Sequence, residues 1–208
     1  MNRLERRDLY RLLGGLLAEC PREQLCEALV ADAALERLGA AVGGDVGAAL
    51  TRMHTELVDG PDAWKEVRSD FTRLFVGPRK KLAPPWESVY RSPARLVMQE
   101  HEREVVRAYA EQRVGFEGMG GVPADHVALE LQFCAWLLDH PKPATRAALR
   151  RFLAEHLLTW VPLFAADVER QAKTELWRAA ARALTGLCAH ETESVPSRKR
   201  MPVVAAST

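Results

Sequence analysis

The chain has 208 residues, of which 48% are hydrophobic and 27% charged. This composition can build one sizeable core, or two small cores packed together, and argues against disorder over most of the chain. The formal net charge is +1, and no apolar run reaches the ~18 residues of a membrane span, so we expect neither a nucleic-acid partner nor stable membrane insertion.

Leucines at helical spacing predict an amphipathic helix over residues 4–19. Arg6-Arg7 at the start of this stretch would be compatible with a twin-arginine export signal. However, Asp8 and Arg11 interrupt the apolar residues, and no clean small-residue cleavage site follows. We therefore expect a soluble protein that stays in the cytoplasm.

The remaining apolar stripes predict further helices, separated by breaks such as Gly43-Gly44 and Gly60-Pro61. The second predicted helix begins at Pro21. The helices predicted after it cover about 45–57, 61–76, 92–114, 123–139, 144–157, 160–172 and 174–189. The helix over 123–139 is apolar nearly all round, which favours a place at the centre of the fold. No strand pattern occurs, so the predicted fold class is all-α.

The segment 77–91 interrupts this pattern, because its one glycine and three prolines exclude a continuous helix. We expect a single helical domain over residues 1–189, with two helical subdomains joined by this proline-rich hinge loop. A hinge of this kind is compatible with a monomer or a domain-swapped dimer. Residues 190–208 are polar and have little to pack, so we expect a disordered tail.

Asp125 and His126 fall at the start of the 123–139 helix, with Glu130 on the same face as His126. One interpretation is an acid/base group of a small helical hydrolase. The other is structural, because an Asp near a helix N-terminus complements the helix dipole and the His–Glu pair is a surface contact. No nucleophile motif accompanies these residues, so we expect no enzyme activity.

The sequence also lacks a complete ligand set for a metal or another cofactor, and none is expected. His126 and Glu130 offer two ligands where catalytic zinc needs three. The cysteines form no Cys-x-x-Cys pair, and we interpret them as reduced core residues: Cys20, Cys26, Cys134 and Cys188.

Trp86 is the distinctive residue of the proline-rich loop. Pro84 and Pro85 restrict the backbone before it, and Glu87 follows it. An indole beside a carboxylate forms a small site for a cationic, partly apolar guest. The alternative is that Trp86 fills the core and Glu87 is solvated.

Three blocks of sequence, in order, resemble the TorD/DmsD family of redox-enzyme maturation chaperones. They are Leu74-Phe75-Val76-Gly77-Pro78 with Pro84-Pro85-Trp86-Glu87-Ser88-Val89-Tyr90, then Pro123-Ala124-Asp125-His126 with Glu130-Leu131, and His156-Leu157-Leu158-Thr159-Trp160-Val161-Pro162-Leu163-Phe164. With the last predicted helix, the resemblance covers roughly residues 60–188, whereas the first helices fit only as generic helices.

The resemblance implies an all-helical fold with two subdomains. It also implies binding of the twin-arginine signal peptide on the catalytic subunit of a molybdopterin oxidoreductase, which is held back from export while its cofactor is inserted. Weak nucleotide binding, suggested for some relatives, is compatible with it. The rival within the same resemblance is a nitrate-reductase-type assembly chaperone that binds its molybdoenzyme subunit elsewhere.

By resemblance, Trp86, Asp125 and His126 correspond to positions of signal-peptide recognition. The residues that shape the site are Leu74, Phe75, Gly77, Pro78 and Pro85, and the motif ends at Tyr90. Several relatives carry glycine at the position of Glu87.

The chemistry of the peptide suits these residues. Arginine prefers a carboxylate that it can engage with two hydrogen bonds, which Asp125 and Glu87 can offer. Phe75 and Trp86 would line an apolar groove for the hydrophobic stretch. We expect Trp86, Asp125 and His126 to converge on one surface, with the loop folded back over the N-terminus of the 123–139 helix.

Overall fold

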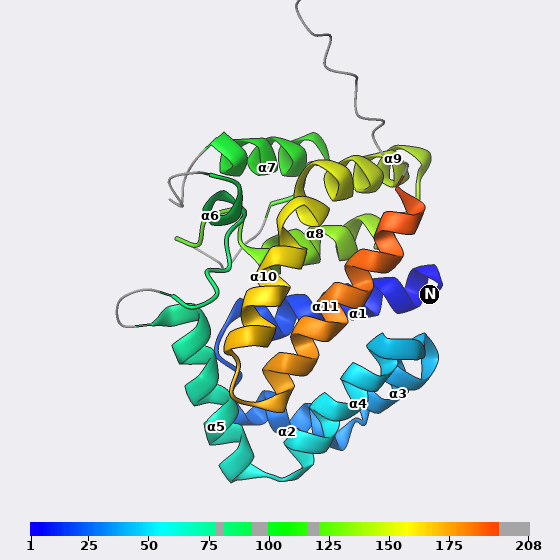
Figure 1. Ribbon diagram of the computed structural model, residues 1–208. Coiled ribbons are helices and arrows are strands. Elements are labelled where there is room, and N and C mark those ends of the chain that lie inside the picture. The colour runs from blue at the N-terminus through cyan, green and yellow to red at the C-terminus, as the bar shows by residue number, and fades with distance from the viewer. Residues whose placement is uncertain (78–80, 93–99, 116–120, 196–208) are drawn as a thin grey trace, which may run out of the picture.

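The computed structural model describes residues 1–77, 81–92, 100–115 and 121–195. Within these ranges the chain is helical and has no strand, which confirms the predicted all-α fold (Figure 1). The helices are α1 (Arg3–Ala18), α2 (Glu23–Ala31), α3 (Ala34–Val42), α4 (Gly44–Val58), α5 (Pro61–Phe71), α6 (Glu87–Arg91), α7 (Glu100–Glu111), α8 (Val127–Asp139), α9 (Pro143–Phe152), α10 (Leu158–Gln171) and α11 (Glu175–Ser194). Two π-helical turns, η1 (Thr72–Val76) and η2 (Leu153–Leu157), extend α5 and α9.

Helix α8 lies at the centre of the fold, as its apolar surface predicts. Ten of its residues are buried, and α1 packs along it through the leucine stripe that includes Leu9 and Leu13. Helix α1 begins at a capping box in which the Asn2 side chain accepts hydrogen bonds from the N–H groups of Leu4 and Glu5. The same leucines that predicted an amphipathic helix therefore dock the N-terminus onto the core.

The core is a single continuous cluster that includes residues from Leu9 to Cys188. Helix α4 packs against α11, and α1 packs against α8, so elements before and after the loop at 77–91 share one core (Figure 1). The prediction of a single helical domain is confirmed, because helices before and after the loop at 77–91 pack against each other.

The cysteines within this domain are unpaired, and Cys26, Cys134 and Cys188 are buried. Among the helices of the described ranges, none combines the length and the apolar character of a membrane span.

The structure corrects several predicted boundaries. The 123–139 helix starts later, at Val127, and 123–126 approach it in a non-helical conformation. The loop at 77–91 ends in a short helix, α6. Helix α11 continues past the predicted boundary at residue 190 to Ser194, because the carboxylate of Glu191 is buried and accepts hydrogen bonds from Arg6 and Tyr10. The predictions for Pro78, for the helix start near 92 and for residues 196–208 fall outside the described residues.

Candidate functional site

The proline-tryptophan loop does fold back onto the start of α8. Trp86 and His126 are both extended and form an isolated antiparallel bridge. The N–H of Glu87 donates to the carbonyl of Asp125 at 3.0 Å, and the N–H of Val127 donates to the carbonyl of Pro85 at 2.9 Å. The structure therefore brings Trp86, Asp125 and His126 together, but Asp125 and His126 are buried, and of the three only Trp86 is partly exposed.

Trp86 is half-buried, and its ring meets the His126 imidazole edge to face at 5.7 Å. The ammonium group of Lys81 lies 5.1 Å from the ring centre, so the indole already receives one cation. Its Nε1–H is buried and finds no partner among the described residues. A buried donor left unpaired costs about 1–3 kcal/mol, so a ligand carbonyl placed here would be favoured.

Asp125 is fully buried, and its carboxylate serves the fold. Oδ2 accepts a hydrogen bond from the Ser88 N–H at 2.8 Å and a second from the Ser88 hydroxyl. This contact ties the 121–126 segment to the first turn of α6. Burial raises the pKa of Asp125, although the hydrogen bonds from Ser88 oppose that shift. The carboxylate is buried, but its other oxygen, Oδ1, has no hydrogen-bond partner among the described residues, so the role of Asp125 as an arginine receptor stays a prediction.

Glu87 is also fully buried, which rules out the solvated alternative for it. Its carboxylate pairs with Arg91 one turn later in α6 and lies 3.0 Å from Nδ1 of His156 in η2. The Glu87 carboxylate therefore links α6 to η2.

His126 and Glu130 do not form the acid/base pair that their spacing allowed. His126 Nδ1 accepts the N–H of Ala128 at 3.2 Å and so caps α8. Burial lowers the pKa of His126 to about 4, so the ring is neutral at pH 7. Glu130 instead accepts the indole N–H of Trp160 at 3.0 Å. Burial raises the pKa of Glu130 well above its usual range, and the nearby charge of Glu87 raises it further.

Two other predicted site residues, Leu74 and Phe75, support the loop from within the core. Leu74 and Phe75 are buried, and Phe75 packs against Phe164 and Trp177, so it belongs to the core and not to a groove. The carbonyl of Leu74 accepts the Ala83 N–H at 3.0 Å, which fixes the start of the loop.

Two further site residues shape the ends of this region. Gly77 ends η1 with φ 56° and ψ 151°, a conformation that favours glycine. Tyr90 is half-buried, and its hydroxyl bonds Asp167 of α10 at 3.1 Å. Both residues fix the loop within the fold.

Across the ranges that the structure describes, no group of three or more His, Cys, Asp or Glu side chains could hold a metal ion.

Comparison with a solved structure defines the class of fold. A crystal structure assigned as a redox enzyme maturation protein from Archaeoglobus fulgidus aligns with a TM-score of 0.59 over 87% of this chain and 91% of its own, at 19% identity. The fold is therefore that of the helical redox-enzyme maturation proteins.

Sequence comparison gives the family. A family model described as nitrate reductase delta subunit matches residues 40–166, more than half of the chain, and the chain belongs to this family. Its relatives include the chaperone protein TorD of Vibrio cholerae serotype O1, 33% identical over 136 residues, and the Tat proofreading chaperone DmsD of Salmonella typhi, 29% identical over 117 residues. The predicted TorD/DmsD resemblance is confirmed.

These alignments cover only part of each protein. They span 61% of this chain and 60% of the TorD protein, and 56% of this chain and 52% of the DmsD protein. The chain thus spans little more than half the length of the curated relatives it matches.

Proposed function

We propose that this chain is a cytoplasmic, non-catalytic chaperone of a molybdopterin oxidoreductase. It binds the twin-arginine signal peptide on the catalytic subunit and assists folding and cofactor insertion before export. The observation that carries this proposal is the bridge between Trp86 and His126, which joins two of the three family motifs at one place. Relatives named as Tat proofreading chaperones support the same role.

The chemistry of the junction favours binding over catalysis. Trp86 offers a half-buried apolar ring and an N–H donor that has no partner among the described residues, which suits an extended peptide with carbonyl groups and apolar side chains. Asp125 and His126 are both engaged with backbone N–H groups, so neither is poised as a general base toward a substrate. In this proposal Asp125 positions the loop, and Trp86 contacts the peptide.

The second candidate is a nitrate-reductase-type assembly chaperone, which the description of the matching family favours. Such a protein would bind its molybdoenzyme subunit at a place other than an export signal. The two candidates share the fold and differ in the part of the client that is recognised. A monomer or a domain-swapped dimer, and weak nucleotide binding, are compatible with either.

Co-purification distinguishes the two candidates. The full chain is mixed with a twin-arginine catalytic subunit, with the same subunit lacking its signal peptide, and with the signal peptide fused to an unrelated carrier. The proposal predicts capture of the first and third and weak capture of the second. Capture of the subunit with and without its signal peptide, but not of the carrier fusion, would favour the nitrate-reductase-type candidate. Capture of none of the three proteins would reject both candidate functions.

A further inference from the structure

A cavity of about 350 Å³ opens where the start of α1, the end of α8, helix α9 and the end of α11 come together. In Figure 1 the end of α11 lies below α9 and above the start of α1. The apolar residues that line the cavity are Leu137, Leu138, Pro141, Leu149, Leu153 and Val195. No lining residue among the described ones belongs to the three family motifs, so the resemblance did not predict this cavity.

The cavity lies at the far end of α8 from the Trp86 bridge. The bridge is formed at His126, just before α8, whereas Leu137 and Leu138 are in the last turn of that helix. Helix α8 has 13 residues, so at about 1.5 Å per residue roughly 20 Å separate the two places. A guest in the cavity is therefore distinct from a peptide bound at Trp86.

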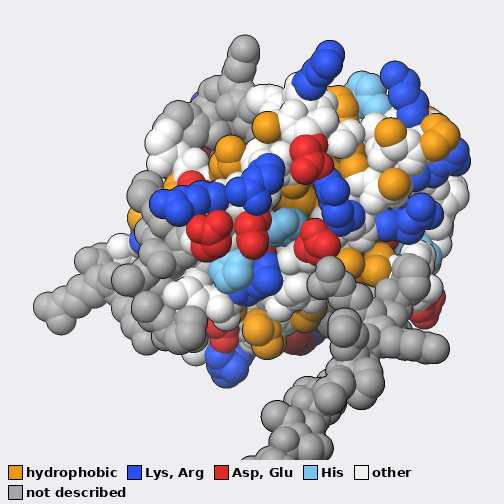
Figure 2. All heavy atoms as spheres, turned by 90° about the horizontal axis from the view of Figure 1, so that it is seen from above, with side chains coloured by type: hydrophobic (Ala, Val, Ile, Leu, Met, Phe, Trp, Pro, Cys, Tyr) orange, Lys and Arg blue, Asp and Glu red, His pale blue; other side chains and the backbone are white. Residues whose placement is uncertain are grey.

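Arginines surround the apolar floor. They are Arg3 and Arg6 from α1 and Arg146 and Arg150 from α9, and among the described residues the lining has one acidic side chain, that of Glu191. The buried Glu191 carboxylate is already neutralised, because Arg6 donates two hydrogen bonds to it, at 2.6 Å and 2.8 Å. On the right of Figure 2, the side of α9, basic side chains border apolar ones. The cavity thus combines an apolar floor with an excess of positive charge.

The ends of two helices explain part of this charge. Helices α8 and α11 both end at the cavity, and cations stabilise the partial negative charge at a helix C-terminus. Arg3 does so directly, because its guanidinium donates to the carbonyl of Leu138 at 2.6 Å. The side chains of Arg146 and Arg150, by contrast, are exposed and make no hydrogen bond or ion pair with the described residues. They lie one turn apart on α9, so both charges are available to one guest.

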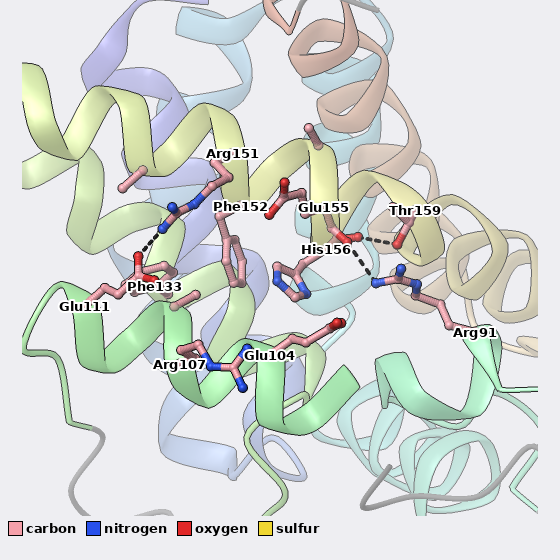
Figure 3. A pocket seen from close by; sticks show the side chains of 13 residues that line it. Arg91, Glu104, Arg107, Glu111, Phe133, Arg151, Phe152, Glu155, His156 and Thr159 are labelled. Carbon is pink, nitrogen blue, oxygen red and sulfur yellow. Dashed lines mark hydrogen bonds and ion pairs between the residues drawn. The ribbon is translucent and has the colours of Figure 1, made fainter. Parts of the chain in front are cut away.

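Another cavity, of about 490 Å³, opens between α7, α9 and η2 and lacks this excess of charge. Its lining has equal numbers of arginines and glutamates (Figure 3), namely Arg91, Arg107, Arg151, Glu104, Glu111 and Glu155. Arg151 and Glu111 form an ion pair across it. Of the two cavities, the one at the ends of α8 and α11 therefore selects for the charge of its guest.

We propose that this cavity docks an acidic peptide segment of a partner protein. A large apolar side chain of the segment enters the cavity, and carboxylates that flank it pair with Arg146 and Arg150 on one side and with Arg3 on the other. Arginine binds carboxylates with directed hydrogen bonds, and an apolar anchor in a pocket is the usual centre of a protein interface. The inference goes beyond the proposed function, because it concerns a second surface that takes a guest of the opposite charge.

The positive charge distinguishes this guest from other occupants. Residues 196–208 directly follow Val195, but they include Arg198, Lys199 and Arg200 and no acidic side chain. A twin-arginine signal peptide is likewise repelled by uncompensated arginines. A fatty acid offers a single carboxylate, whereas the free arginines come from two helices, α1 and α9. A segment with several carboxylates around an apolar residue fits this arrangement best.

The test is calorimetric titration of the full chain with a synthetic peptide in which two leucines lie between pairs of glutamates. One matched peptide has glutamine in place of every glutamate, and a second has serine in place of both leucines. We expect the glutamine peptide to bind at least about fivefold more weakly, because its ion pairs are lost. The serine peptide should bind about tenfold more weakly or worse, because no apolar side chain is buried.

Substitutions of exposed arginines locate the site on the protein. Arg146→Gln and Arg150→Gln should each weaken binding of the glutamate peptide about two- to fivefold, and the double variant about tenfold. Arg107→Gln is the matched control. Arg107 is also exposed and unpaired among the described residues, but it lines the cavity of Figure 3, so its loss should change nothing. Circular dichroism of each variant verifies that it is folded.

Several results would overturn the proposal. If the Arg146 and Arg150 variants bind as tightly as the wild type, or Arg107→Gln weakens binding as much as they do, the attraction is not specific to this cavity. Equal binding of the serine and leucine peptides would mean that no apolar anchor is held. Displacement of the glutamate peptide by a synthetic peptide of residues 196–208 would assign the cavity to the chain's own end.

A saturating twin-arginine signal peptide should leave the affinity for the glutamate peptide unchanged. Competition between the two peptides would place them at one site and overturn the inference. Failure of the signal peptide to bind at all would reject the proposed function and leave the result for the glutamate peptide standing, so the two claims are tested separately.

Discussion

Replacing Asp125 with alanine should destabilise the protein, because the carboxylate is a fully buried tie between two segments. It accepts hydrogen bonds from both the N–H and the hydroxyl of Ser88. In the alanine variant these two donors lose their acceptor inside the fold. The consequence is loosening of α6 from the start of α8, and with it of the Trp86 bridge.

The magnitude follows from the number and type of the lost contacts. Leaving a buried donor unsatisfied costs about 1–3 kcal/mol, while removal of a buried carboxylate recovers part of its desolvation cost. We expect a net loss of about 2 kcal/mol in the free energy of unfolding. For a domain of this size, that corresponds to a Tm lower by about 4–8 °C.

Urea unfolding and calorimetry of the wild type and of Asp125→Ala measure this difference. Asp59→Ala is the matched control, since its exposed side chain makes no hydrogen bond or ion pair with the described residues. An Asp125→Ala protein as stable as the wild type would refute the reasoning. If such a protein also lost affinity for the signal peptide, Asp125 would be a recognition residue, as the family resemblance implied.

Three further substitutions test the packing and the electrostatics of the fold. Gly47→Ala should lower the free energy of unfolding in urea by about 1–3 kcal/mol, because the added Cβ would overlap the carbonyl oxygen of Gly39 where α3 and α4 meet. Gly15→Ala has open space around it in α1 and should instead raise that free energy by about 0.5–1 kcal/mol. Equal effects at both sites would contradict this account. Asp70→Asn should destabilise at pH 7, because burial alone would raise the pKa of Asp70 but hydrogen bonds that include the Thr174 N–H lower it overall. A carboxyl whose pKa is lowered by folding contributes stability above its unfolded pKa, near 4, and loses it as pH falls through its folded pKa. The difference in free energy of unfolding between wild type and variant should therefore shrink in acid. A difference that grows in acid would be contrary to the prediction.

Much of the fold could be predicted from local patterns. Leucine spacing in α1, proline at the start of α5 and the apolar surface of α8 each agree with the packing that follows. The return of the loop onto α8 was also predictable, because the family motifs place Trp86 and Asp125 at one site.

The buried polar network could not be predicted, because it depends on partners distant in the sequence. Glu130 is four residues from His126, which favoured a surface pair, yet its partner is the indole of Trp160, 30 residues away. Glu87 is next to Trp86, yet it faces inward to His156. The carboxylates of Glu87 and Glu130 therefore support the fold.

Hydrogen exchange of the full chain, with and without a saturating twin-arginine signal peptide, tests the central claim most directly. The account predicts slower amide exchange in the loop, in α6 and at the start of α8, and no slowing when each arginine of the peptide is replaced by its uncharged analogue citrulline. Protection confined to α2, α3 and α4, or no protection in the presence of the arginine peptide, would contradict it.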